Sequence, residues 1–320
     1  MGQFLSNASP GAGHDTVSTC VLTMDPCDYL EVRTYEEKVH HRRFVAPDHQ
    51  RENIMIAVTG VSGKLGRVVL DDLLTRLPAE QVVGVARTPE KVDVPGVEVR
   101  QGDYEDPTSL EKAFAGADVV LIVSSPDVTP GTRPRQHGNA IAAAQAAGVG
   151  RIVYTSAISA DTGPGFLADH AVTEGLLRES GVPFTVLRNS FYSDLFVNPA
   201  VVAAAVEAGE IAAADAGKAL NTATIRDFGL AASAALTGTG HENAVHELRG
   251  PLWTYDELAA AITEATGTAV THRELPLADE DFIGALVSSG FFSEPGDDLA
   301  TLLGRPATAI GELVRAAAQR

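Results

Sequence analysis

The sequence predicts a doubly wound α/β fold, in which a parallel sheet carries helices on both faces and a smaller C-terminal α/β lobe follows. A β-branched apolar run enters a glycine-rich turn and then an amphipathic helix, between residues 55 and 77. Strand-like and helix-like segments then alternate to about residue 190, as in a parallel sheet with crossover helices. Beyond Asn189 the alternation loosens, which predicts a separate lobe.

Each expected strand is a short apolar run, and each expected helix has apolar residues at a helical period. The helix at 107–114 has the clearest start, because Asp106 suits the N-cap and Pro107 the first turn. Residues 119–124 form a continuous apolar run, as expected of a parallel strand buried on both faces. The expected strands are 55–58, 82–86, 98–101, 119–124, 151–156 and 184–188. The expected helices are 67–77, 107–114, 136–148 and 167–180.

The lobe is expected to hold helices at 227–236, 255–265, 279–289 and 307–318, with short strands at 223–225 and 245–248. Residues 55–190 are therefore predicted to form the sheet domain, and residues 191–320 mainly the lobe. No internal repeat is present in the sequence.

Residues 1–54 differ in character, because neither a strand period nor a helix period persists there. We expect a disordered extension, or a translation start at Met55 directly before the first strand. Six residues separate the two cysteines, whereas structural zinc sites favour two to four, so no metal is predicted. The candidate ligands considered were Cys20, Cys27, His40, His41 and His49.

Composition excludes several classes of protein. The net charge of −18 argues against a nucleic-acid partner or an anionic membrane surface, because phosphate would be repelled. No apolar run reaches membrane-spanning length, and no signal core opens the chain. Two cysteines indicate a reducing compartment. We expect a cytoplasmic protein, with both a monomer and a homodimer left open.

The turn T-G-V-S-G-K-L-G predicts a dinucleotide site. One glycine permits a sharp turn, one lets backbone amides approach a pyrophosphate, and one lets the helix pack on the strand. The helix N-terminus then offers free N–H groups and a partial positive charge to the phosphates. The alternative is a tight turn without a ligand. The predicted cofactor contacts here are Gly60, Val61, Ser62, Gly63, Lys64, Leu65 and Gly66.

The end of the second strand distinguishes the two nicotinamide cofactors. A carboxylate there binds the ribose hydroxyls of NAD, whereas a cation accepts the 2′-phosphate of NADP. This chain has Arg87 in V-A-R-T-P-E-K and no carboxylate at the strand end, which favours NADP(H). Lys91 is either a second contact or a solvated side chain. Gly102 and Asp103 either adjoin the adenine or form an ordinary strand exit.

These motifs, together with T-S-A-I-S-A-D, L-R-N-S-F-Y-S-D and T-A-T-I-R-D-F-G, resemble NmrA-like atypical short-chain dehydrogenases/reductases. Within that group the chain resembles the bacterial type 2 NADPH:quinone oxidoreductases, from residue 55 nearly to the C-terminus. The resemblance implies a Rossmann NAD(P)-binding domain at 55–190, a substrate lobe at 191–320, and a quinone or related conjugated carbonyl as acceptor. It implies further cofactor contacts at Ser124, Ser125, Ser190 and Phe191; Ser156, at a strand end where ligands bind, is added to them.

The chain lacks the Tyr-x-x-x-Lys pair with which typical short-chain dehydrogenases protonate an alkoxide. The corresponding helix has His170 and Glu174 one turn apart, as the similar quinone reductases do. A quinone tolerates the loss, since hydride addition yields a hydroquinone anion, a far weaker base than an alkoxide. The predicted catalytic residues are Tyr192, Asn189 and His170.

Structural alternatives stay open for these residues. His170 could equally be hydrogen-bonded to Glu174 or to water, and Phe191 could be a core residue or a pocket wall. The chain as a whole could also be a non-catalytic NADP-binding regulator, as some NmrA-like proteins are. Reduction or isomerisation of another conjugated carbonyl or of a sugar is a third, weaker alternative.

Overall fold

The computed structural model describes residues 19–20, 34–35, 54–163, 165–279 and 281–319. The chain divides into two compact units, Met1–Glu52 and Asn53–Arg320. In the first unit, β1 (Thr19–Cys20) pairs antiparallel with β2 (Thr34–Tyr35). The rest of the predicted extension, with Cys27 and the three histidines considered as zinc ligands, lies outside the described residues.

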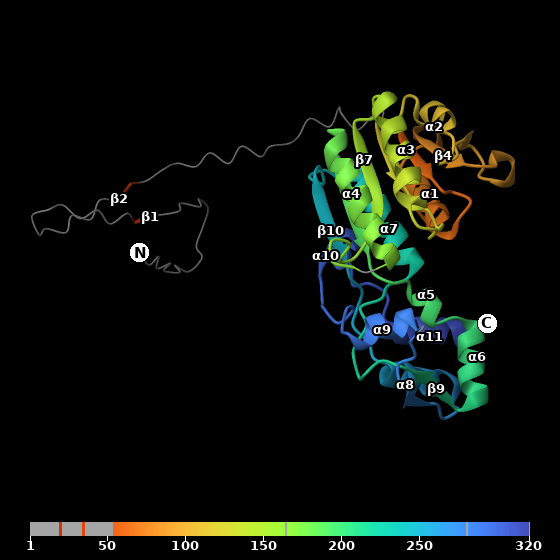
Figure 1. Ribbon diagram of the computed structural model, residues 1–320. Helices are drawn as coiled ribbons and strands as arrows, with labels where there is room; N and C mark the ends of the chain where they lie inside the picture. The colour runs from red at the N-terminus through yellow and green to blue at the C-terminus, as the bar shows by residue number, and fades with distance from the viewer. Residues whose placement is uncertain (1–18, 21–33, 36–53, 164, 280, 320) are drawn as a thin grey trace, which may run out of the picture. The chain divides into compact units, whose positions relative to one another are not determined.

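The second unit is built on a seven-stranded sheet in which every neighbouring pair is parallel (Figure 1). The strands run in the order β10-β8-β7-β6-β3-β4-β5. The order reverses between β3 and β6, and ligands bind at such a switch point in doubly wound sheets. The strands are β3 (Ile56–Thr59), β4 (Val82–Ala86), β5 (Glu98–Gln101), β6 (Val119–Ile122), β7 (Arg151–Ala157), β8 (Phe184–Asn189) and β10 (Ala244–Leu248).

Helices cover both faces of this sheet, because successive strand residues point to opposite sides. Val58 and Leu121 pack on the side of α1 and α7, whereas Ala57 and Val120 pack on the side of α2, α3 and α4. The predicted doubly wound fold is therefore confirmed. These helices are α1 (Lys64–Arg76), α2 (Pro107–Phe114), α3 (Thr132–Ala146), α4 (Ala168–Ser180), α7 (Ile225–Thr237) and α10 (Asp298–Leu303), which contacts α7. Short 3-10 helices occupy Ala79–Gln81, Pro89–Lys91 and Gly165–Leu167.

A smaller lobe contains α6, α8, α9, α11 and β9 (Figure 1). It packs around its own apolar cluster, which includes Trp253, Ile262 and Phe292. Its two-stranded parallel sheet joins β9 (Glu210–Ala213) to β11 (Thr271–Glu274). Thr254 and Glu257 form a capping box at the start of α8. The lobe helices are α5 (Ser193–Phe196), α6 (Pro199–Ala208), α8 (Tyr255–Thr266), α9 (Phe282–Ser288) and α11 (Ile310–Ala318).

Two expected strands of the C-terminal half differ from the structure. The strand expected at 223–225 is wrong: Ala223 forms a single bridge to Tyr192, and Thr224 caps α7 through its side chain. The strand expected at 245–248 exists as β10, but it pairs with β8 at the edge of the main sheet. The second half of the chain thus contributes α7, β10 and α10 to the sheet domain as well as forming the lobe.

No helix within the described ranges is both long enough and apolar enough to cross a bilayer.

Candidate active site

The glycine-rich turn has the geometry that its three glycines predict. Gly60 has a φ of +65°, a left-handed conformation that favours glycine. The Gly63 N–H donates to the Gly60 carbonyl at 2.9 Å and closes the turn. A Cβ atom on Gly66 would lie 2.4 Å from the Gly60 carbonyl oxygen, so only glycine lets α1 pack this closely against β3.

The N-terminus of α1 is open to an anion. Its N-cap, Gly63, makes no side-chain hydrogen bond to the helix, and its first turn contains no acidic residue. First-turn N–H groups without a side-chain cap, together with the helix dipole, suit the pyrophosphate of a dinucleotide.

A cleft of about 400 Å³ lies at this helix end, where β3, β4 and β6 end at the switch point. Most of the predicted cofactor contacts line it. The predicted residues in the lining are Gly60, Ser62, Gly63, Lys64, Leu65, Gly66, Arg87, Ser124 and Ser125. The others are Thr59, Val85, Ala86, Gly102, Asp103, Tyr104, Val123, Pro126, Asp127 and Gln136.

Arg87 follows β4 directly and is exposed at the cleft. Across the residues that the structure describes, no hydrogen bond or ion pair occupies its guanidinium. A free guanidinium suits a phosphate, with which it forms paired charge-assisted hydrogen bonds. Gly102 and Asp103 line the cleft too, whereas Lys91 does not.

Tyr104 is a cleft residue that the sequence analysis missed. Its hydroxyl donates to the Val123 carbonyl at 2.7 Å and accepts from the Thr59 hydroxyl at 2.6 Å. Thr59 Oγ1 in turn accepts from the Val123 N–H at 2.9 Å. This closed network joins the ends of β3 and β6 beneath the cleft, and burial raises the pKa of Tyr104. Its position directly after Gly102-Asp103 was the available signal.

The backbone at Ser124 and Ser125 is held by buried side chains. The Ser124 N–H donates to Thr155 Oγ1 at 2.8 Å, and the Ser125 N–H donates to His137 Nε2 at 2.9 Å. Arg133 Nε donates to the Ser125 carbonyl at 2.8 Å. The cleft wall after β6 is therefore rigidly placed.

His170 lies on α4, is only 5% exposed and is absent from the cleft lining. Its Nδ1 is 2.7 Å from the Tyr154 hydroxyl, so this nitrogen is not bonded to Glu174, one of the two partners that the alternative named. Glu174 instead binds Arg188 through two hydrogen bonds, at 2.9 and 2.8 Å. Burial lowers the pKa of His170 to about 4, so the imidazole is neutral at pH 7. A role as proton donor stays a prediction.

Four predicted cofactor contacts have side chains outside the cleft lining, each for a packing reason. Val61 is buried in the core beneath α1. The Ser156 hydroxyl donates to Glu174 at 2.8 Å, and the Ser190 hydroxyl donates to Asn221 at 2.6 Å. Phe191 packs its ring edge-on against Phe292 in the lobe core, at a centroid distance of 4.7 Å. Their cofactor contacts stay predictions.

Asn189 ends β8, and Tyr192, the N-cap residue of α5, contacts its side chain. The Asn189 side chain is 8% exposed, and its buried Oδ1 has no hydrogen-bond partner among the described residues. Tyr192 packs edge-on against Phe228, and burial raises its pKa, with the Asn189 side chain opposing the rise. A buried amide oxygen without a partner and a protonated phenol suit a ligand that both donates and accepts hydrogen bonds.

A family model described as NAD(P)H-binding matches residues 60–232, which span the glycine turn, the cleft and β8. The chain belongs to this NAD(P)H-binding family. The matched residues make up more than half of the chain. The geometry of the glycine turn, which suits a dinucleotide, agrees with membership in this family.

Individual relatives agree with this membership. The chain is 42% identical to Escherichia coli quinone oxidoreductase 2 over 252 residues, which cover 77% of this chain and 86% of the relative. The crystal structure of the NADPH-dependent quinone oxidoreductase from Escherichia coli with NADPH matches with a TM-score of 0.74 at 36% identity, over 81% of this chain and 98% of that one. Triphenylmethane reductase of Citrobacter sp., complexed with NADP(H), matches with a TM-score of 0.77 at 36% identity, over 82% and 100%. The predicted resemblance to NmrA-like enzymes and bacterial quinone oxidoreductases is confirmed.

Proposed function

We propose that this chain is an NADPH-dependent oxidoreductase that reduces quinone-type acceptors. The observation that carries the proposal is the open cleft at the sheet's switch point, in a chain 42% identical to quinone oxidoreductase 2. When bound, the dinucleotide supplies a hydride. The protein binds it, orients it and holds the acceptor.

Arg87 supports NADPH over NADH. Its guanidinium, which has no partner among the described residues, faces the cleft directly after β4, at the place where the adenosine ribose lies in such folds. The first-turn amides of α1 are placed to hold the pyrophosphate between Arg87 and the wall at Ser124 and Ser125.

The residues at the end of β8 suit a quinone. Two-electron reduction adds a hydride and a proton to the quinone and gives a hydroquinone. Because the hydroquinone anion is a weak base, a protonated phenol such as Tyr192, or water, suffices to complete it. We propose that Tyr192 and Asn189 hold the acceptor oxygen, since the two polar side chains contact each other just where β8 gives way to α5. We also propose His170 as a second proton donor, which acts through the Tyr154 hydroxyl 2.7 Å from its Nδ1.

The first test measures turnover. Purified full-length protein is mixed with NADPH and either 1,4-benzoquinone or menadione, and the absorbance at 340 nm is followed. We expect enzyme-dependent loss of NADPH with both acceptors. Tight NADPH binding with no turnover across a panel of quinones would instead favour the non-catalytic regulator.

The second test concerns Arg87. We expect Arg87→Ala to weaken NADPH binding about 10- to 100-fold and NADH binding far less, because a charge-assisted phosphate contact contributes about 1.5–3 kcal/mol. Fluorescence titration of both cofactors measures this. Arg76→Ala is the matched control. Arg76 lies at the C-terminal end of α1, about 18 Å along the helix from the N-terminal end that faces the cleft. Equal losses for NADPH and NADH would contradict the assignment.

The proposal includes a cytoplasmic location and a monomer or homodimer without nucleic acid. The charge of −18 supports the absence of a nucleic-acid partner, and the use of only two cysteines supports the cytoplasmic location. Light scattering of the purified protein measures its assembly.

A further inference from the structure

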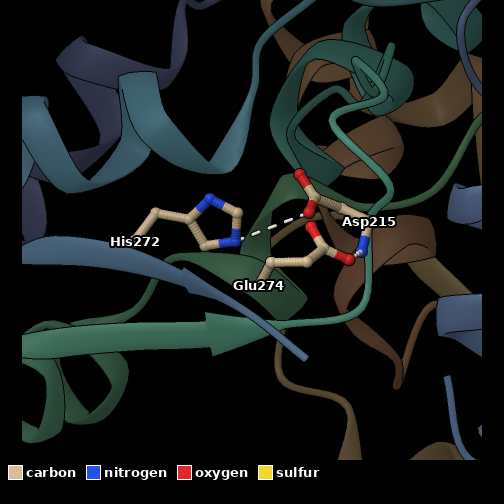
Figure 2. A group of neighbouring side chains, drawn as sticks. All are labelled: Asp215, His272 and Glu274. Atoms are coloured by element: carbon tan, nitrogen blue, oxygen red, sulfur yellow. Dashed lines mark hydrogen bonds and ion pairs between the residues drawn. The ribbon is translucent and has the colours of Figure 1, made fainter. Parts of the chain in front are cut away.

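A second cluster of ionisable side chains lies in the lobe, apart from the residues that line the cleft. Asp215 follows β9 by two residues, and His272 and Glu274 are both on the neighbouring strand β11. Alternate residues of a strand share one face, so both β11 side chains face Asp215. Figure 2 shows the three side chains pointing toward one another, and one ligand atom from each lies within 4.8 Å of the others.

The ring orientation of His272 directs a lone pair into this cluster. Its Nδ1 is 3.3 Å from an oxygen of the Asp256 carboxylate, which only accepts hydrogen bonds, so Nδ1 carries the proton. In the neutral ring Nε2 is then an unprotonated acceptor. Histidine ligands of metals usually have such a carboxylate on the other ring nitrogen. The Tyr255 ring, stacked on the imidazole, fixes its plane.

Nε2 of His272 faces Oδ1 of Asp215 at 3.5 Å, and neither atom has a hydrogen-bond partner in the described part of the chain. The Asp215 side chain is only 2% exposed. Two acceptors opposite each other in a buried site repel unless a cation lies between them. Within the described ranges, no Lys or Arg side chain makes an ion pair with Asp215 or Glu274. When His272 is neutral, no side chain of the described residues balances the charge of the two carboxylates.

We propose that Asp215, His272 and Glu274 form a zinc-binding site. Oxygen and nitrogen ligands lie 2.0–2.2 Å from zinc, which places neighbouring ligands of a tetrahedron about 3.4 Å apart. The separation of 3.5 Å between Asp215 and His272 matches one tetrahedral edge. Both remaining separations involve Glu274, whose ligand atom lies within 4.8 Å of the other two, and water completes the fourth position.

The donor set favours zinc over magnesium and calcium. An imidazole with two carboxylates suits zinc, whereas magnesium and calcium favour oxygen ligands alone. Two carboxylates and a neutral imidazole also balance a divalent charge. Glu274 is already held in place, because its Oε1 accepts the backbone N–H groups of Asp215 and Ala216. The bound ion would clamp the turn after β9 to β11.

The test adds zinc chloride alone to the full-length protein after EDTA treatment and gel filtration. Bound zinc is counted by mass spectrometry of the metal, affinity is measured by calorimetry, and cobalt(II) absorption reports tetrahedral coordination. The variants are Asp215→Asn and Glu274→Gln, which keep side-chain shape. Glu264→Gln is the matched control, because Glu264 is an exposed glutamate of α8 in the same lobe.

We expect wild type and Glu264→Gln to bind one zinc equivalent that both cluster variants lose, and zinc to raise the thermal midpoint only of the two proteins that bind it. Asp256→Asn should weaken binding about 10- to 100-fold through the histidine. Circular dichroism and NADPH titration show whether each variant is folded; if Asp215→Asn is not, the exposed Glu274→Gln decides. Equal zinc content in wild type and cluster variants, including zinc held at residues 1–54, would overturn the proposal, as would no bound zinc in wild type.

Discussion

At the scale of single residues, Gly66 shows how one missing methyl group shapes the cleft. Its backbone lies so close to Gly60 that a Cβ would meet that carbonyl oxygen at 2.4 Å, whereas a Cβ on Gly63 would lie at 3.3 Å. The atom that would be struck belongs to the backbone, so no side-chain rotation relieves the clash.

We therefore expect Gly66→Ala to lower the free energy of unfolding by about 1–3 kcal/mol, and Gly63→Ala by less. Urea unfolding of the two variants beside wild type measures this difference. Two alanine variants of equal stability would show that the close contact between α1 and β3 is not the cause of the loss in Gly66→Ala.

The buried histidines predict a dependence of stability on pH. Burial lowers the pKa of His170 to about 4 and that of His137 to about 3, from the ordinary value of 6.5. Below about pH 6.5 the unfolded chain binds protons that the folded chain does not. Stability is thus fully present above pH 6.5 and falls as the pH approaches 4, by up to about 1.4 kcal/mol per pH unit for each histidine.

Urea unfolding at pH 7.0 and 5.0 tests this expectation. Wild type should lose stability between the two values, and His170→Gln should lose less, because glutamine takes up no proton. If wild type and His170→Gln lost the same unfolding free energy, His170 would take up no proton when the chain unfolds.

Residue types alone predicted only part of the cleft. Gly60, Gly63, Gly66 and Arg87 were found because dinucleotide binding places a steric or charge demand on each position. Tyr104 was missed because its role depends on a network between three segments far apart in the chain. Such partners are set by tertiary packing, which no local pattern encodes.

At the scale of elements, one buried ion pair joins four of them. Glu174 of α4 is 1% exposed and binds Arg188 of β8. The Ser156 hydroxyl of β7 donates to Glu174, and Glu247 of β10 accepts from Arg188 at 2.8 Å. In register, Arg188 lies between Ser156 and Glu247, so the cluster spans neighbouring strands.

We expect Arg188→Met to lower the free energy of unfolding by about 3 kcal/mol, because it leaves a buried carboxylate without its main partner. Arg178→Met is the matched control: Arg178 also contacts Glu174 but is half exposed, so its loss should cost below about 1 kcal/mol. Adding Glu174→Gln to Arg188→Met should restore part of the stability. Equal costs for the two arginine variants in urea unfolding would contradict this assignment.

Most strands and helices of the sheet domain follow from period and end signals. The helix expected at 107–114 has the predicted bounds, and Asp106 accepts the N–H groups of Thr108 and Ser109 as an N-cap should. The expected strand at 223–225 is wrong because β-branched Thr224 serves as a cap, a role that depends on the helix after it. The membership of β10 in the main sheet is a long-range pairing, which local sequence does not show.

At the scale of the whole molecule, strand order and charge act together. The switch between β3 and β6 opens the cleft, and the backbone amides of α1 together with Arg87 make it attractive to anions in a chain of net charge −18. A strongly negative protein thus takes up a negative cofactor through local dipoles rather than through its overall field. The proposed zinc site lies on the lobe sheet, which the sequence analysis did not anticipate.

The most direct test of this account is a single turnover of the protein–NADPH complex. Protein in slight excess over NADPH is mixed rapidly with 1,4-benzoquinone, and the 340 nm absorbance is recorded beside a protein-free mixture. We expect a decay faster than that of free NADPH, with a rate that rises with quinone concentration and falls in Arg87→Ala at limiting cofactor. A decay no faster than in the protein-free mixture, with NADPH shown to be bound, would contradict it.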